Sequence, residues 1–413
     1  MSGLATFIKV LAQFLVSKAV ALVIGPTGLV YLGQLNSFTS LWLLFSTGSI
    51  KSGVTKYISE FKSEVRTSNS IISTSLLITI VCSMISAVLL YVRAEEYSNL
   101  IFSSRGYAYI INIFAMTILF YSINIILLAI INGYKKYKLY VKINIINSLL
   151  GLVLTIWLVL RYGLRGALVE AVTLQAITCF VTVYFIYSKR LFPLKLNLKL
   201  ASSQFIRKLS AYSFMAAVPA FINHYFRIIL RNHITDTLSV TDTGYWEGVS
   251  RISGLYFLIL STATATYILP RMSEIRDGRL LRKELFNSFK FIVPLTLLVS
   301  SAIYIFRDVL ILLTLSNEFI QMRELFLFQM IGDTFKICGY ILSSLMVAKA
   351  MARSFIVVEI AFGLFYFVLV YYGVIFFGIQ GTVYAYAIMY LCNFVTLLII
   401  FRKLIFSGVY NHG

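Results

Sequence analysis

The sequence predicts an all-α polytopic membrane protein with about twelve transmembrane helices. Of its 413 residues, 59% are hydrophobic and only 13% are charged. That charged share is about half of what a soluble globular domain carries. The mean hydropathy is +0.87, and long apolar runs recur from one end of the chain to the other. A soluble fold of this length has too much surface to cover with so few charges, so a large soluble domain is excluded.

Twelve apolar runs are long enough to cross the hydrocarbon core of a bilayer, which takes roughly 20 residues of helix. The first run contains Lys9 and Lys18 and ends at Gly25-Pro26 without a small-residue cleavage pattern, so we interpret it as a span and not as a signal peptide. The second and seventh runs are the least apolar. The predicted spans are 4–25, 31–50, 70–92, 107–131, 141–160, 164–187, 210–234, 244–269, 286–306, 325–348, 354–377 and 379–401.

Basic residues concentrate in alternate loops, and this pattern predicts the orientation. The odd-numbered loops hold few of them, namely Arg93, Arg105, Arg161, Arg165, Arg307 and Arg323. The even-numbered loops and the C-terminal tail hold Lys51, Lys56, Lys62, Arg66, Lys135, Lys136, Lys138, Lys142, Lys189, Arg190, Lys195, Lys199, Arg207, Lys208, Arg271, Arg276, Arg279, Arg282, Lys283, Lys290, Lys349, Arg353, Arg402 and Lys403. Because cytoplasmic loops are enriched in Lys and Arg, we expect both termini to be cytoplasmic. The same bias accounts for the net charge of +20 without a nucleic-acid surface.

The longest polar stretch between spans, about 188–209, divides the chain into two halves of six spans each. We therefore predict an N-terminal six-helix lobe over 1–190, a cytoplasmic linker over 191–209 and a C-terminal six-helix lobe over 210–413. An equal division of this kind is typical of transporters built by internal duplication. Two short glycine-containing segments, Gly28 to Gly33 and Gly244 to Gly248, resemble each other weakly and support the repeat. Glycines spaced in this way also arise from close helix packing.

The predicted orientation can be tested at Ser202, which lies in the loop between the halves. A cysteine placed there is expected to resist labelling by a membrane-impermeant thiol reagent in intact cells, and to react once the membrane is opened. The physical reason is the concentration of Lys and Arg in that loop, which holds it on the cytoplasmic side. Clear labelling from outside would refute the orientation.

Charged residues inside the predicted spans are the candidates for function, because an ionised side chain at mid-membrane costs about 2.5–3.5 kcal/mol on insertion scales. At a rise of about 1.5 Å per residue, three cations lie about 10 Å below the outer surface and a fourth lies about 18 Å deep. Such cations can surround a cavity that binds an anion, above all a phosphate or pyrophosphate. The four are Lys18, Arg227, Arg251 and Lys336.

Other interpretations of these charges remain open at this stage. Glu247 and Arg251 are spaced i and i+4, and Asp333 and Lys336 are spaced i and i+3, so each pair can form a local salt bridge. Lys9 and Arg231 lie near span ends and can extend to the interface. Lys18 and Arg227 have no acidic residue at these spacings but can pair with distant acids, such as Glu170 or Glu359.

Motifs for catalysis and metal binding are absent from the sequence. There is no phosphate-binding loop of the Gly-x-x-x-x-Gly-Lys-Ser/Thr type, and no outer loop is long enough for a transferase or polymerase active site. The histidines and cysteines are too scattered for a metal site, a catalytic set or a disulfide framework. We therefore expect no enzyme activity, no catalytic residue, no metal and no cofactor. These scattered residues are His224, His233, His412, Cys82, Cys179, Cys338 and Cys392.

Seven short motifs are spread along nearly the whole chain: Gly25 to Leu29, Gly53 to Tyr57, Trp246 to Ser253, the Tyr-Ile-Leu-Pro stretch ending at Pro270, Leu315 to Phe319, Gly332-Asp333 with Lys336, and Val347 to Ala350. In these motifs the chain resembles the Wzx-type polysaccharide flippases, in the O-antigen and enterobacterial common antigen branch.

This resemblance implies the fold of the multidrug/oligosaccharidyl-lipid/polysaccharide exporter superfamily, with two six-helix lobes around a central cavity. It implies a substrate of oligosaccharide on undecaprenyl pyrophosphate, such as an O-antigen repeat unit used in lipopolysaccharide biosynthesis. This substrate would move from the cytoplasmic to the periplasmic leaflet of the inner membrane by alternating access. The implied partners are the O-antigen polymerase and the chain-length regulator.

The charged residues fit that scheme as follows. Lys18, Arg227, Arg251 and Lys336 would bind the pyrophosphate, while Lys9, Lys56 and Glu247 would further line the cavity. Asp333 or Glu247 would bind a coupling ion, either H⁺ or Na⁺. Two alternatives remain. The first is a drug or small-solute exporter of the same superfamily, but a cavity lined by cations disfavours the binding of cationic drugs. The second is a membrane polysaccharide polymerase, but the short outer loops leave no room for its active site.

Overall fold

The computed structural model describes residues 2–189, 202–349 and 351–407, and within these ranges the chain is helical with short connections and no strand. The predicted all-α fold is thus confirmed. Most of the predicted linker over 191–209 lies outside the described residues, and its last residues form the start of a long helix, α8 (Ser203–Thr237).

Eight helices of the described chain are long and apolar enough to cross a membrane, judged by length and composition alone. Three further long helices are not among these eight, and they correspond to the predicted second, seventh and eighth spans. They are α2 (Pro26–Ser46), α8 and α9 (Val240–Glu274). Two of these helices, α8 and α9, carry the ion-paired residues of the site described below.

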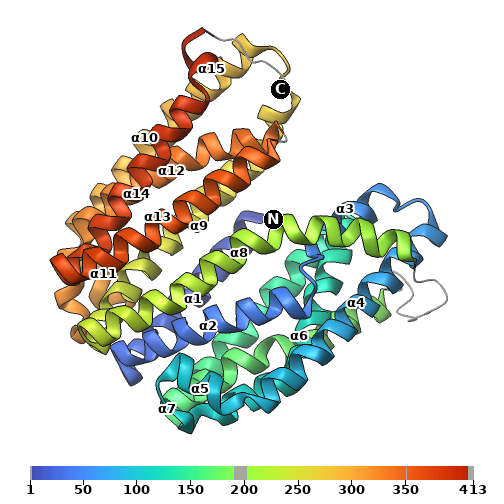
Figure 1. The fold of residues 1–413 in the computed structure, drawn as a ribbon, viewed down its shortest axis with the longest axis horizontal. Helices are drawn as coiled ribbons and strands as arrows, with labels where there is room; N and C mark the ends of the chain where they lie inside the picture. Colours follow the sequence, from blue (N-terminus) through green and yellow to red (C-terminus); the bar gives the residue numbers. More distant parts are fainter. Residues whose placement is uncertain (1, 190–201, 350, 408–413) are drawn as a thin grey trace. The chain divides into compact units, whose positions relative to one another are not determined.

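The described residues form two compact units. The first contains the chain up to Ile24 and from Tyr31 to Ile229, and the second contains Gly25–Val30 and the chain from Leu230. Helices α2 and α8 therefore contribute residues to both units. Figure 1 shows that each unit is a bundle of long helices.

The first unit is organised around two helices. α6 (Ala108–Gly133) packs along α7 (Tyr137–Ser188), α1 (Ser2–Ile24) packs against α7, and α4 (Val65–Val92) packs against α6. Short elements connect these spans: α3 (Lys51–Glu60), α5 (Ala94–Phe102) and the 3-10 helix η1 (Arg105–Tyr107). A core of buried aliphatic side chains from α3, α4 and α6, with Phe205 and Leu209 of α8, closes one end of the unit.

The second unit is organised around α12 (Phe326–Ala348), which packs against α9, α10 (Gly278–Ile305) and α14 (Gln380–Ile400). Helix α13 (Ala352–Phe377) packs against α14. The connecting elements are α11 (Arg307–Thr314), η3 (Asn317–Leu325) and α15 (Arg402–Ser407). The Lys349 ammonium, at the end of α12, donates to the Ile275 carbonyl at the end of α9 (2.5 Å), and its partial burial lowers the pKa of Lys349.

Two tight turns of the same conformation separate the predicted spans 141–160 and 164–187 in the first unit and 354–377 and 379–401 in the second. Gly163 interrupts α7 with φ 56° and ψ −133°, and Gly378 follows α13 with φ 58° and ψ −144°. Only glycine adopts such a backbone without strain. Three residues later, a Cβ on Gly166 would collide with the Leu158 carbonyl, and one on Gly381 with that of Gly373, so glycine also permits the close approach. The predicted separation of 141–160 from 164–187 is confirmed.

The order of elements also repeats. In each unit a long helix is followed by a short helix, a 3-10 helix and another long helix: α4, α5, η1 and α6 in the first, and α10, α11, η3 and α12 in the second. Together with the matched glycine turns, this order supports the internal duplication that the equal division of spans predicts.

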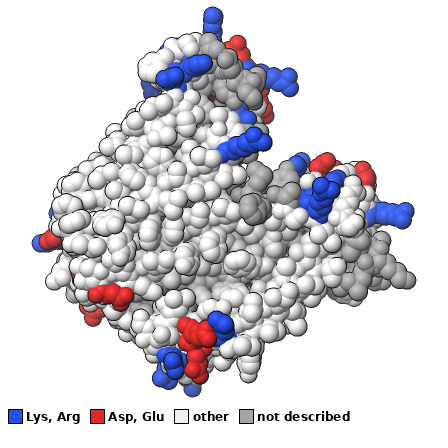
Figure 2. Space-filling view, viewed as in Figure 1, with Lys and Arg blue, Asp and Glu red and all other residues white. Residues whose placement is uncertain are grey.

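Charged side chains are sparse on the visible surface. Figure 2 shows them gathered toward the ends of the helices, with wide areas between that carry no Lys, Arg, Asp or Glu. Such apolar belts are what helices that face lipid require.

Candidate functional site: ionic and aromatic clusters in the second unit

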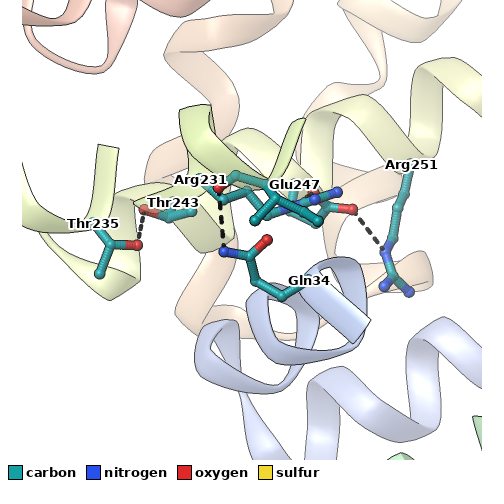
Figure 3. Close-up of polar contacts among 7 residues, drawn as sticks. Gln34, Arg231, Thr235, Thr243, Glu247 and Arg251 are labelled. Carbon is teal, nitrogen blue, oxygen red and sulfur yellow. Dashed lines mark hydrogen bonds and ion pairs between the residues drawn. The ribbon is translucent and has the colours of Figure 1, made fainter. Parts of the chain in front are cut away.

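The short turn between α8 and α9 brings two charged residues to the same level. Ser239 caps α9, accepting from the Asp242 N–H (3.0 Å), and the Thr235 and Thr243 hydroxyls bond across the helices (2.9 Å). Arg231 precedes the turn by about as many residues as Glu247 follows it, so the antiparallel helices place the two side chains opposite each other (Figure 3).

These two residues form a buried ion pair. Arg231 Nε lies 2.9 Å from Glu247 Oε2, and the side chains are only 2% and 8% exposed. The Arg231 guanidinium also lies over the Trp246 ring, 5.9 Å from its centroid. The expectation that Arg231 extends to the membrane interface is therefore wrong, because a carboxylate on the neighbouring helix holds it inside the unit.

A second arginine contacts the same carboxylate. Arg251 Nε lies 3.8 Å from Glu247 Oε1, which confirms the predicted i,i+4 pair, and the Arg251 side chain is 22% exposed. Figure 3 shows Arg251 one helical turn further along α9, extending toward Glu247. Two guanidinium groups thus share one carboxylate, and the cluster of Arg231, Glu247 and Arg251 carries a net charge of +1.

Open space lies beside this cluster on α9. A Cβ built on Gly254, which follows Arg251 by three residues, would meet no described atom within 4 Å. Since residues three apart lie on one face of a helix, the more exposed of the two arginines borders this space. A guanidinium with one distant partner and an open approach can bind an anion.

A second cluster lies around Asp333 of α12, which is fully buried. Its Oδ1 accepts hydrogen bonds from Ser253 Oγ of α9 and from Tyr386 Oη of α14, both at 2.7 Å. Its other oxygen, Oδ2, and the hydroxyls of Tyr256 and Ser300 are buried without a hydrogen-bond partner among the described residues. Four helices therefore enclose a polar group around one carboxylate.

Aromatic rings surround the ammonium of Lys336. It lies 4.2 Å from the Phe257 centroid, 5.4 Å from that of Tyr390 and 5.7 Å from that of Tyr386. It also donates to the Tyr386 hydroxyl at 3.2 Å. The ion pairs of the described residues do not include a direct one between Asp333 and Lys336; instead, the Tyr386 hydroxyl bonds to both. We call Lys336, Tyr386 and Asp333 the relay.

The remaining predicted site residues belong to the first unit. Lys18 of α1 is half-buried and Arg227 of α8 is exposed. Lys9 is exposed and lies near Lys51, and Lys56 of α3 is exposed with its ammonium 5.4 Å from the Tyr57 centroid. Since Arg251 and Lys336 belong to the second unit, a ring of all four predicted cations stays a prediction.

Sequence spacing missed two residues of these clusters. The contact of Arg231 with Glu247 could have been predicted, because the two residues lie at about equal distances along the chain from the α8–α9 turn. Residues so placed face each other when the two helices are antiparallel. Tyr386 had no such signal, because it reaches Asp333 from a span 53 residues further along the chain. Among the described residues, no group of three or more His, Cys, Asp and Glu side chains could hold a metal ion, and the four cysteines are free.

Known proteins resemble this chain over almost its full length. It is 26% identical over 390 residues to the lipid III flippase of Escherichia coli (strain K12), which covers 94% of each chain, and equally to the lipid III flippase of Shigella flexneri. These relatives are transporters, in agreement with the prediction that the chain is not an enzyme.

Solved structures share the fold at low identity. An inward-facing multidrug resistance MATE family transporter of the MOP superfamily matches with a TM-score of 0.81 and 14% identity, over 96% of both chains. A MOP superfamily transporter from Pyrococcus furiosus Vc1 (DSM3638) matches with a TM-score of 0.68 and 14% identity, over 97% of this chain and 96% of that one.

A family profile described as polysaccharide biosynthesis protein matches residues 33–324, which is more than half of the chain. That match includes α9 and the ion-paired cluster of Arg231, Glu247 and Arg251. With its membrane-spanning helices and its two-unit fold, the chain is a multi-span membrane protein of the polysaccharide biosynthesis protein family.

Proposed function

We propose that this protein is a flippase that moves a lipid-linked oligosaccharide across the bacterial inner membrane, from the cytoplasmic to the periplasmic leaflet. The observation that carries the proposal is the cluster of Arg231, Glu247 and Arg251, which keeps a net positive charge inside a membrane-spanning bundle and presents Arg251 to open space. An anionic headgroup such as a pyrophosphate matches that charge. The name of the curated relatives, lipid III flippase, supports the same substrate class.

The cluster gives Arg251 a specific role. Glu247 is fixed by the short ion pair to Arg231, and it holds Arg251 only through a longer contact. A phosphate oxygen that approaches from the open face can replace this contact with a shorter charge-assisted hydrogen bond, while Glu247 keeps its first partner. Lys336 would supply a second cation in the same unit, and Lys18 and Arg227 would supply two from the first unit. The polyprenyl tail would remain in the lipid.

The transport cycle would be alternating access driven by an ion gradient, with Asp333 or Glu247 binding H⁺ or Na⁺. Of these two carboxylates, Asp333 fits the role better, because one of its oxygens is buried without a partner among the described residues, whereas both Glu247 oxygens contact arginines. The substrate would be an O-antigen or similar repeat unit on undecaprenyl pyrophosphate, and the polymerase and chain-length regulator of the same pathway would be partners.

The test is complementation of a deletion strain, read from surface polysaccharide and from the leaflet in which the lipid-linked oligosaccharide accumulates. We expect Lys18→Ala, Arg227→Ala and Arg251→Ala each to abolish export at a normal membrane level of the protein, because each removes a cation from the anion's path. The matched control is Arg271→Ala on α9, where an arginine with a 55% exposed side chain pairs with Glu284. It is expected to complement.

Two outcomes would contradict the proposal. Full complementation by all three alanine variants at normal protein levels would end the role of these cations. A deletion strain with unchanged polysaccharide but altered drug sensitivity would indicate an exporter of small solutes instead.

A further inference from the structure

The first unit contains a buried carboxylate that the proposed cation sites do not use. Glu170 lies on the second half of α7, seven residues after the Gly163 turn, which places it about 10 Å along the helix from that turn. Its exposure is 9%. Both halves of α7 lie within an apolar helix long enough to cross a membrane.

Glu170 differs from the other buried acids of the described chain in having no cation beside it. The buried acidic residues there are Glu170, Glu247 and Asp333. Glu247 contacts two arginines, and Asp333 is joined to Lys336 through the Tyr386 hydroxyl. Glu170 forms no ion pair with any described residue.

The groups that face Glu170 are neutral. The Thr155 hydroxyl, on the first half of α7, lies beside the carboxyl, and Tyr121 of α6 is close enough to interact with it electrostatically. The remaining helix packed on α7 is α1, which carries Lys9 and Lys18. The ion pairs among the described residues do not include one between either lysine and Glu170. A carboxylate in such surroundings has lost its water without gaining a counter-charge.

The hydrogen bonds near Glu170 can accommodate a carboxyl that carries a proton. The Thr155 hydroxyl donates to the Gly151 carbonyl at 2.7 Å. In this arrangement its oxygen can accept a hydrogen bond from a protonated Glu170 carboxyl. Gly151 lies beside the carboxyl, since a Cβ there would be 3.7 Å from Glu170 Oε1, an ordinary contact distance.

We propose that Glu170 is a proton-binding site of the first unit, protonated in the arrangement described here and able to release its proton when water or a cation reaches it. As a coupling group it rests on the proposed transport function, but proton binding itself does not depend on transport. The site would add a second titratable position to the one proposed at Asp333, in the other half of the duplicated fold.

The direct test is infrared spectroscopy of the purified full-length protein in detergent at neutral pH. A protonated carboxylic acid has a C=O stretch that shifts in D₂O, and we expect this band to be weaker in Glu170→Gln than in the wild type and unchanged in Glu96→Gln. Glu96 is the control, because its side chain is exposed and its carboxylate pairs with Arg93 at 3.0 Å. Equal bands with and without Glu170 would overturn the proposal.

Transport in proteoliposomes gives the second readout. Glu170→Gln is expected to remove a pH-dependent step of transport, and Glu170→Asp, which can still bind a proton, is expected to restore it. Elution as a single species in gel filtration checks that each variant is folded. If the infrared band depends on Glu170 but no variant or wild type transports a lipid-linked oligosaccharide, then the proton site stands and the transport function fails. A pH profile that is unchanged in Glu170→Gln would refute the coupling role.

Discussion

Replacing Glu247 by alanine is expected to lower the free energy of unfolding by about 3–5 kcal/mol. Arg231 would then lie buried, with a side chain 2% exposed, without the carboxylate that pairs with it at 2.9 Å. Arg251 would lose the same partner and would be repelled by Arg231. An uncompensated charge of this kind costs much more than the pair contributes, because its desolvation is no longer offset.

The measurement is thermal unfolding of detergent-solubilised protein, compared with a control that removes the same carboxylate from an exposed pair. Glu96 pairs with Arg93 at 3.0 Å, with side chains 66% and 60% exposed. Glu96→Ala should therefore change stability by only about 0–1 kcal/mol. The double variant Arg231→Met with Glu247→Leu should recover most of the loss, because it removes both buried charges. Equal midpoints for Glu247→Ala and Glu96→Ala would contradict the expectation.

The positions of most spans could be predicted from the sequence because apolar length depends only on composition. The turns at Gly163 and Gly378 lie where the predicted spans 141–160 and 354–377 give way to the next. The long helices α8 and α9 exceed their predicted spans at both ends, because polar residues continue a helix that apolarity alone would terminate.

The site was only partly predictable, since sequence spacing reports contacts within one helix. The spacing of Glu247 and Arg251 predicted their contact correctly. The shorter contact to Arg231 crosses between helices, and the spacing of Asp333 and Lys336 gave no indication that a tyrosine hydroxyl lies between them. Helix packing thus decides which charged side chains contact each other in a buried cluster, and the sequence does not show this packing directly.

The second large effect is expected from a substitution in the relay of Lys336, Tyr386 and Asp333. Asp333→Asn keeps an oxygen for the Ser253 and Tyr386 hydroxyls but removes the negative charge and the ability to bind a coupling ion. We expect it to reduce gradient-driven transport roughly 10- to 100-fold at a normal protein level. That range corresponds to the about 1.5–3 kcal/mol carried by a hydrogen bond to a charged group.

The companion variant Tyr386→Phe keeps the Asp333 charge but removes the hydroxyl that connects it to Lys336. The phenylalanine ring retains the face that lies 5.7 Å from the Lys336 ammonium, and only the hydroxyl that accepts from Lys336 and donates to Asp333 is lost. If the relay couples the ion to the substrate anion, this variant should lower transport as Asp333→Asn does. Tyr390→Phe, which alters the same aromatic surroundings without touching either of these two bonds, should transport normally.

The decisive measurement is the dependence of transport on the imposed gradient in proteoliposomes. A coupling carboxylate at Asp333 predicts that Asp333→Asn no longer responds to a change in pH or Na⁺ across the membrane, while substrate binding persists. A purely structural Asp333 predicts the opposite pattern, in which protein stability falls and the surviving protein keeps its full response. An unchanged gradient response in Asp333→Asn would remove this residue from coupling and leave the relay as a support that orients Lys336.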